Sequence, residues 1–381
     1  METAPIREIE RLCFALRGLD RAAFLWQSPT LLVTSSSNQI RPMMNSCDAK
    51  RLRTDRPALF ILLLCCALLL NACSSKRMDL RQTLQAQNIQ NPERSPVVLA
   101  AYQPWFGRPG HINVGYSSQD RTVLERQIEE ARSLGISGFV VNWYGRDHQF
   151  EDSSYALMQS LAAGTRDFKV ALMYDEDADA SDPTEAAIND LNYAYDHYIS
   201  RHASSGGAYL RYNTQPVIFI FPKGGRTDWL RVSRAMKNWP EKPALLYKDP
   251  VAKWNDAFDG FYAWVQPGPK GWAHDGSNLG LDYLDNFYQT MNSRFPEKIA
   301  VGGAWPGFND SRASWSRNRK IDYRCGKTFE ESLRAFRRYH GPQNPLPFLM
   351  IETWNDYEEG TAIERGYNNC GPSRSSVIAG R

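Results

Sequence analysis

Five carboxylates crowd into one short stretch near the end of the chain, MIETWNDYEEGTAIERG, which spans Met350 to Gly366. Carboxylates this close together repel one another in a folded protein unless some are solvated, paired or kept protonated. Such arrangements concentrate at active sites. A pair of acids, one as proton donor and the other as base or nucleophile, is what cleavage of a glycosidic bond requires. We expect Asp356 and Glu359 to form that pair.

The other acids of the stretch have structural alternatives. We expect Glu358 to point to solvent, and Glu364 to begin a helix or to bind an arginine. A purely structural use of Asp356 and Glu359 is the competing interpretation of the pair.

Eight apolar, β-branched or aromatic runs precede or contain this stretch, and each ends in polar, Gly or Pro residues. They cover residues 97–105, 136–145, 168–176, 216–224, 243–250, 260–267, 298–308 and 347–356. Several are separated by amphipathic stretches that place Leu124, Ile128, Ala131 and Leu134 on one helix face, and Phe329, Leu333, Phe336 and His340 on another.

Repeated strand and helix units with nearly continuous apolar strands predict the α/β class, and eight units predict a single (β/α)₈ TIM-type barrel. A doubly wound open sheet is the alternative, but the first run continues as YQPWFGRPG, which lacks the G-x-G-x-x-G turn. The residues after Glu364 are rich in Gly, Asn and Ser, so we expect no eighth helix from residues 365–381 and a barrel incomplete at its last helix.

A barrel places its chemistry at the carboxyl ends of its strands, where this chain concentrates aromatic and polar side chains. Rings stack on the faces of sugars, so we expect the following residues to bind substrate: Tyr102, Trp105, Asn142, Trp143, Tyr144, Tyr174, Asp175, Trp264, Trp305, Trp354, Asn355 and Tyr357. The alternative for any single aromatic is that it caps the barrel core.

Three motifs, YQPWFG, NWYG and TWNDYEEGTAIE, resemble glycoside hydrolase families 71 and 99, the endo-acting α-1,3-glucanases and endo-α-mannosidases. The resemblance spans about residues 96 to 366. It implies a (β/α)₈ barrel with no organic cofactor, catalysis by Asp356 and Glu359, and a substrate cleft that includes Tyr102, Trp105 and Trp143. Asp356 departs from the mannosidase family, which usually has Glu there, and matches the glucanase pattern. The MYDED segment after the third run does not align residue by residue.

The resemblance leads to a mechanism in which Glu359 is the general acid and Asp356 the base. The three-residue spacing accommodates the carboxyl separations of both retaining and inverting enzymes. Because Asp is one methylene shorter than Glu, it leaves more room for a water molecule, which favours inversion.

The N-terminal region predicts export. A basic segment precedes a 13-residue apolar run, Ala58 to Leu70, which is too short for the roughly 20 residues of a spanning helix. It ends in LNAC, which resembles a lipobox and predicts lipidation of Cys73. A soluble cleaved protein or an uncleaved anchor is the alternative.

We therefore divide the chain into an upstream extension or mis-assigned start (1–43), a lipoprotein signal (44–73), a polar linker (74–95), the barrel (96–367) and an irregular tail (368–381). The first segment could instead be a genuine cytoplasmic extension. The expected location is the bacterial cell envelope, with a membrane partner through the lipid.

Charge and cysteine content exclude other classes. A formal net charge of +3 gives no basic face for nucleic acid. No cysteine or histidine cluster has metal-ligand spacing, which disfavours a metal-dependent hydrolase. Cys325 and Cys370 could pair or remain free thiols. The oligomeric state stays open. The expected function is hydrolysis of α-linked glycans, such as α-mannan or α-1,3-glucan, with a non-catalytic glycan-binding surface lipoprotein as the alternative.

Overall fold

The computed structural model describes residues 96–366 apart from residues 225, 342 and 343. The predicted extension, signal, linker and tail lie outside these residues, and so do Cys73 and Cys370. Cys325 is disulfide-bonded. Within the described part of the chain, no helix is both long and apolar enough to cross a membrane.

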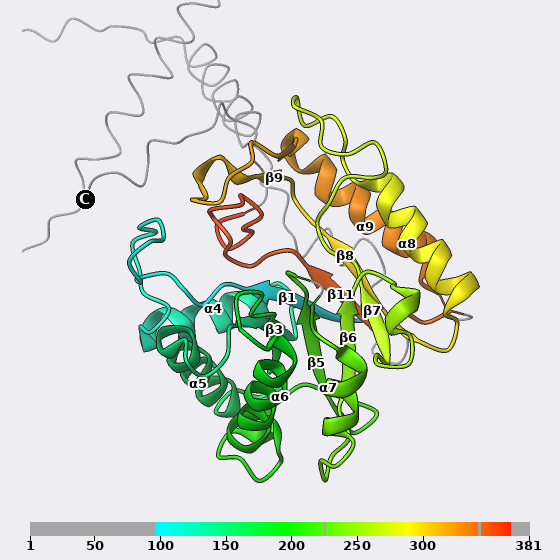
Figure 1. Ribbon diagram of the computed structural model, residues 1–381. Helices are drawn as coiled ribbons and strands as arrows, with labels where there is room; N and C mark the ends of the chain where they lie inside the picture. The colour runs from blue at the N-terminus through cyan, green and yellow to red at the C-terminus, as the bar shows by residue number, and fades with distance from the viewer. Residues whose placement is uncertain (1–95, 225, 342–343, 367–381) are drawn as a thin grey trace, which may run out of the picture. The chain divides into compact units, whose positions relative to one another are not determined.

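Eight parallel strands close into a barrel, which confirms the predicted fold class (Figure 1). They are β1 (Val97–Tyr102), β2 (Gly138–Trp143), β3 (Lys169–Asp175), β5 (Gln215–Phe221), β6 (Ala244–Lys248), β7 (Gly260–Tyr262), β8 (Ile299–Ala304) and β11 (Phe348–Ile351). Seven of them lie within a predicted run, and β5 begins at Gln215, one residue before its run. The first and last strands, β1 and β11, pair with each other, and a further pairing between β3 and β5 completes the ring. Apolar residues fill these strands because both faces are buried.

Within residues 96–366, six α-helices cover the outside of the barrel (Figure 1). They are α4 (Arg121–Ser133), α5 (Gln149–Ala163), α6 (Pro183–Ala194), α7 (Trp229–Met236), α8 (Leu281–Arg294) and α9 (Lys327–Tyr339). The predicted apolar faces of α4 and α9 are buried against the barrel, except at Leu134 and His340, which cap the two helices. Between β6 and β7 the connection holds only the 3₁₀ turn η3 (Ala252–Trp254).

The remaining elements are short. Strand β4 (Arg211–Tyr212) pairs antiparallel with β5, and β9 (Phe308–Asn309) pairs with β10 (Lys320–Ile321) in the long β8–α9 connection. The other turns are η1 (Tyr195–Ile199), η2 (Gly206–Ala208), η4 (Asp310–Arg312) and η5 (Arg324–Gly326). No helix follows β11 among the described residues, and most of residues 365–381 lie beyond them.

Strand pleating decides which side chains reach the barrel interior. Successive side chains of a strand point to opposite faces. Hydrogen bonds to the surrounding helices show that three strand ends point outward: Tyr102 bonds Gln127 of α4, Trp143 bonds Asp152 of α5, and Tyr174 bonds Asp190 of α6. The adjacent residues Gln103, Asn142 and Asp175 therefore face inward at the carboxyl end of the barrel.

Candidate active site

The segment after β11 is fastened to the end of β1. The Asn355 side chain accepts the Gln103 N–H at 2.7 Å and donates to the Gln103 carbonyl at 2.9 Å. Thr353 and Thr361 close the segment on itself through a 3.1 Å backbone hydrogen bond, and the Asp356 N–H bonds the Thr353 hydroxyl at 2.8 Å. These contacts fix the segment that carries both expected catalytic acids.

Asp356 lies at the bottom of the site, with 2% of its surface exposed. Its Oδ1 accepts the backbone N–H groups of Glu358 at 3.1 Å and Glu359 at 2.8 Å. Its Oδ2 accepts from the Gln103 amide at 3.3 Å. Burial raises the pKa of Asp356 well above its usual range, and the nearby Glu359 charge raises it further.

Glu359 lies nearer the surface, with 19% of its side chain exposed. Its Oε1 accepts the indole N–H of Trp315 at 3.0 Å and lies 3.4 Å from the Arg319 guanidinium. Burial raises the pKa of Glu359, whereas the Trp315 hydrogen bond and the Arg319 charge oppose that rise. The pair therefore retains a proton at a pH where ordinary carboxyl groups have lost theirs, as acid–base chemistry requires.

Gly360 permits the turn that follows Glu359. Its φ of +71° is in the left-handed region, and a Cβ there would lie 2.3 Å from the Tyr323 hydroxyl. That hydroxyl donates to the Gly360 carbonyl at 2.7 Å. A residue without a side chain is thus needed beside the expected acid.

Two neighbouring acids have structural roles. The expectation that Glu358 points to solvent is wrong, because the β1–α4 connection covers it: its carboxylate bonds His111 Nδ1 at 2.8 Å and the Ile112 N–H at 3.1 Å. The expectation that Glu364 binds an arginine is confirmed, since it lies 3.6 Å from the Arg126 guanidinium. No helix begins at Glu364.

A fifth acid, Glu352, is fully buried where β11 ends. Neither of its oxygens has a hydrogen-bond partner of normal geometry, although the Val265 N–H lies close enough to lower its pKa slightly. Its carboxyl group packs against Gly303, where a Cβ would lie 2.6 Å from Oε1. Burial raises the Glu352 pKa well above its usual range, and Lys248 opposes this rise. An uncharged carboxyl group beneath the site is the physical consequence.

Four aromatic side chains, those of Trp105, His111, Trp315 and Tyr144, form a cluster beside the two acids, here called the aromatic corner. Trp105 stacks on His111, with ring centroids 4.8 Å apart and an interplanar angle of 10°. The Trp315 ring stands edge-on to both, at 6.0 Å and 6.1 Å. Tyr144 lies 6.3 Å from Trp105, and Tyr357 packs in the same small cluster. Trp105 and Tyr144 thus belong to the same corner as Trp315, whereas the Tyr357 hydroxyl donates to Glu364 at 2.6 Å. Their role in substrate binding stays a prediction.

Charged groups also lie at these strand ends, and one of them, Lys223, lies 5.0 Å from the centre of the Tyr144 ring. Lys223 pairs with Asp175 at 2.5 Å, yet burial still raises the Asp175 pKa to about 6. Lys248 lies 4.3 Å over the Phe221 ring, and burial lowers its pKa despite the charges of Asp249, Glu352 and Glu359.

Two further expected ligand contacts lie among these groups. Trp264 packs edge-on against Phe221 at 5.3 Å, and the Asn142 amide lies 3.5 Å from the Tyr144 hydroxyl.

Several expected ligand contacts are instead core residues. This correction applies to the fully or almost fully buried side chains of Tyr102, Trp143, Tyr174, Trp305 and Trp354. The first three point to the helices because of the pleat. The Trp305 indole bonds the Leu279 carbonyl at 3.2 Å, and the Trp354 ring packs 5.4 Å from Phe139. Asn355 is also fully buried, and its side chain makes the two hydrogen bonds to the Gln103 backbone, here called the clamp.

Four side chains of the site were not predicted: Gln103, His111, Trp315 and Arg319. Gln103 could have been found from the pleat, since it follows the outward Tyr102. The other three come from long connections whose path the strand pattern does not indicate.

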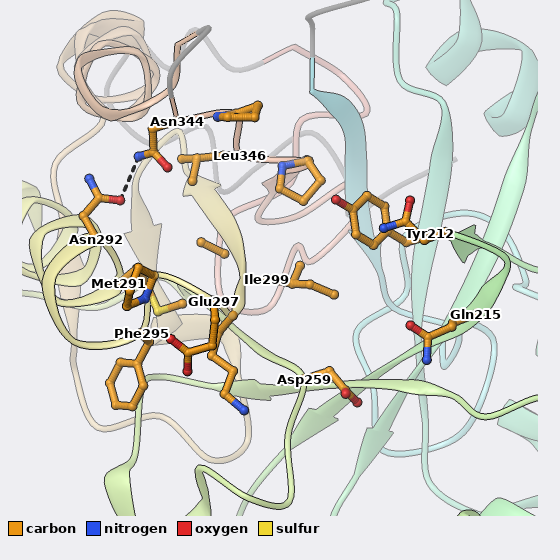
Figure 2. A pocket seen from close by; sticks show the side chains of 16 residues that line it. Tyr212, Gln215, Asp259, Met291, Asn292, Phe295, Glu297, Ile299, Asn344 and Leu346 are labelled. Atoms are coloured by element: carbon orange, nitrogen blue, oxygen red, sulfur yellow. Dashed lines mark hydrogen bonds between the residues drawn. The ribbon is translucent and has the colours of Figure 1, made fainter.

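A cavity of about 760 Å³ lies at the opposite end of the barrel from the two acids (Figure 2). Its lining includes Gln215 and Ile299, the first residues of β5 and β8, and Asp259 and Pro347, which precede β7 and β11. The amino ends of barrel strands serve stability rather than chemistry, so this cavity is not the expected site. Among the residues that the structure describes, no cluster of His, Cys, Asp and Glu could hold a metal ion.

The chain resembles known proteins in sequence. The chain is 22% identical over 305 residues to the glycoprotein endo-α-1,2-mannosidase of Mus musculus, which covers 74% of this chain and 60% of the mouse protein. The Rattus norvegicus protein of the same name is 22% identical over 66% of this chain and 55% of its own length. The chain therefore spans little more than half of these relatives. No family model matches it.

Solved structures show the same fold. The GH99 endo-α-mannosidase of Bacteroides thetaiotaomicron superimposes with a TM-score of 0.55 at 18% identity, over 70% of this chain and 87% of that one. Its complex with bis-tris-propane gives the same TM-score at 17% identity, over 71% of this chain and 87% of that one. The chain is thus similar in sequence to endo-α-mannosidases and has the barrel fold of glycoside hydrolase family 99.

Proposed function

We propose that this protein is a glycoside hydrolase that cleaves α-linked glycans with Asp356 and Glu359. The observation that carries the proposal is the pair itself: two acids with raised pKa values, linked by the hydrogen bond from the Glu359 backbone N–H to Asp356 Oδ1, beside an aromatic corner at the carboxyl end of a barrel. Paired acids flanked by stacking rings suit sugar binding and proton transfer to a glycosidic oxygen.

We assign the roles of general acid and base from how deeply each carboxyl group is buried. Glu359 is partly exposed, on the side from which a leaving group can depart, so it is the general acid. Asp356 is buried below it and held by two backbone N–H groups, so it is the base that activates water or a sugar hydroxyl. The shorter Asp356 favours water, and with it inversion.

An α-mannan is the first substrate to test, since the similar proteins are endo-α-mannosidases. An α-1,3-glucan is the second, because Trp354-Asn355-Asp356-Tyr357 follows the glucanase pattern.

The test is release of reducing sugar from a panel of α-mannans and α-glucans by the wild type, Asp356→Asn and Glu359→Gln. We expect one substrate class to be cleaved and each variant to lose activity by about 10²–10⁴-fold. Glu297→Gln is the control, because Glu297 lines the cavity at the opposite end. Binding of a glycan by calorimetry without cleavage of any would instead identify the non-catalytic glycan-binding protein.

We further propose that Cys73 carries a lipid that anchors the protein in the bacterial cell envelope. The order of basic segment, apolar run and LNAC supports this proposal.

A further inference from the structure

The indole ring of Trp315 is exposed to solvent beside Glu359, the expected general acid. Among the described residues, the large hydrophobic side chains that are exposed are Trp315, at 40%, and Val97, at 38%. Trp315 is nevertheless held in place. Its N–H bonds Glu359 at 3.0 Å, and its ring contacts Trp105 and His111 edge-on. An exposed but oriented indole has a free surface that a flat, partly apolar ligand can cover.

The position of Trp315 defines which part of a substrate would reach it. In glycoside cleavage, the general acid gives its proton to the glycosidic oxygen as the C1–O bond breaks, and the leaving sugar departs with that proton. The sugar that remains lies toward the base, Asp356, which is buried. Trp315 touches Glu359 from the exposed side. The departing sugar therefore lies over Trp315.

We propose that Trp315 is the binding platform for the sugar on the leaving-group side of the scissile bond, and that the substrate accordingly carries a sugar there. This inference rests on the proposed function and on Glu359 as the acid. If the inference holds, the rate of cleavage depends on whether the leaving group is a sugar.

The test compares two substrates with the same sugar at the cleaved carbon. One is an α-linked oligosaccharide, and the other is the corresponding α-glycosyl fluoride, whose leaving group has no ring and needs no proton. We expect Trp315→Ala to lower kcat/KM on the oligosaccharide at least tenfold and on the fluoride less than threefold. Trp315→Phe keeps a ring and should retain KM on the oligosaccharide within about threefold of wild type.

Trp239→Ala is the matched control. Trp239 also stacks on a neighbour, with its centroid 4.3 Å from that of Tyr195, but it precedes β6 at the other end of the barrel. Its loss should change neither kcat/KM value. Thermal unfolding of each variant checks that the fold is intact.

Equal losses on the two substrates, or no loss on the oligosaccharide, would overturn the inference. If the wild type cleaves neither substrate, the proposed function fails. Calorimetry with the oligosaccharide then tests separately whether Trp315 binds a sugar. A tenfold weaker Kd for Trp315→Ala would support it. An unchanged Kd, or no binding by the wild type, would overturn it.

Discussion

The backbone N–H of Glu359 donates a 2.8 Å hydrogen bond to Oδ1 of Asp356. One expected catalytic residue thus orients the carboxylate of the other, and the clamp between Asn355 and Gln103 holds the segment that carries both. The positions of the two acids are therefore coupled through the main chain. Their contributions to catalysis should accordingly be non-additive.

The two acids should respond differently to the leaving group. Asp356→Asn keeps an oxygen that can accept the Glu359 N–H, so the turn should persist while hydrolysis of both the oligosaccharide and the glycosyl fluoride falls by about 10²–10⁴-fold. Glu359→Gln should lose oligosaccharide cleavage to the same extent and retain most of its activity on the fluoride, which needs no proton. Steady-state kinetics of both variants measures this. The reverse pattern would exchange the two roles.

The pH profile offers a second test of the roles. The Trp315 N–H lowers the pKa of Glu359, so Trp315→Phe, which removes this donor and keeps a ring, should raise that pKa. A general acid must be protonated, so its pKa sets the alkaline limb of kcat/KM. We expect the alkaline limb of Trp315→Phe to move to higher pH while the acid limb stays in place. Movement of the acid limb alone would identify Glu359 as the base.

Glu352→Gln should stabilise the protein in a pH-dependent way. The folded-state pKa of Glu352 is raised, so the native state binds a proton that the unfolded state releases above its ordinary pKa. Stability therefore falls as pH rises from the unfolded pKa to the folded one, by about 1.4 kcal/mol for each unit of difference. Denaturant unfolding should give equal stabilities below about pH 4 and a more stable variant at neutral pH. A difference that does not change with pH would contradict this account.

Substitution of a core tryptophan should affect stability, whereas substitution of a tryptophan at the site should affect KM. Trp143→Phe removes the indole that bonds Asp152 at 2.9 Å inside the wall of the barrel, and should lower the free energy of unfolding by roughly 1–3 kcal/mol with little change in KM. Trp105→Ala opens the aromatic corner and should raise KM. Kinetics and unfolding of both variants test the division. A raised KM for Trp143→Phe at unchanged stability would place Trp143 in the binding site after all.

The lipid anchor has a direct test in cells. Cys73→Ala removes the proposed lipid acceptor, so the protein should leave the detergent phase or be misprocessed. Phase partitioning and the mass of the mature N-terminus measure this, with Cys66→Ala, inside the apolar run, as the control. Unchanged partitioning of the Cys73 variant would end the proposal.

The barrel and the segment that carries the acids are predictable from the sequence alone. Eight apolar runs recur at intervals that parallel strands buried on both faces require, and each overlaps one strand of the barrel. The cluster of acids directly follows the last run in the chain, so it lies at the carboxyl end of β11. The carboxyl ends of the strands are where barrel enzymes have their active sites. Local pattern is sufficient for these features, since each depends on residues close together in the chain.

Which of the side chains at the strand ends face the site depends on the folded structure. At the ends of β2 and β3 the sequence offered consecutive candidates, and the pleat turned Trp143 and Tyr174 toward the helices, as it turned Tyr102 at the end of β1. Long connections decided the rest. The β1–α4 connection covers Glu358 with His111. The β8–α9 connection brings Trp315 and Arg319 to Glu359 from 44 and 40 positions away. Such approaches depend on how loops pack over the barrel, and no periodicity in the sequence encodes that packing.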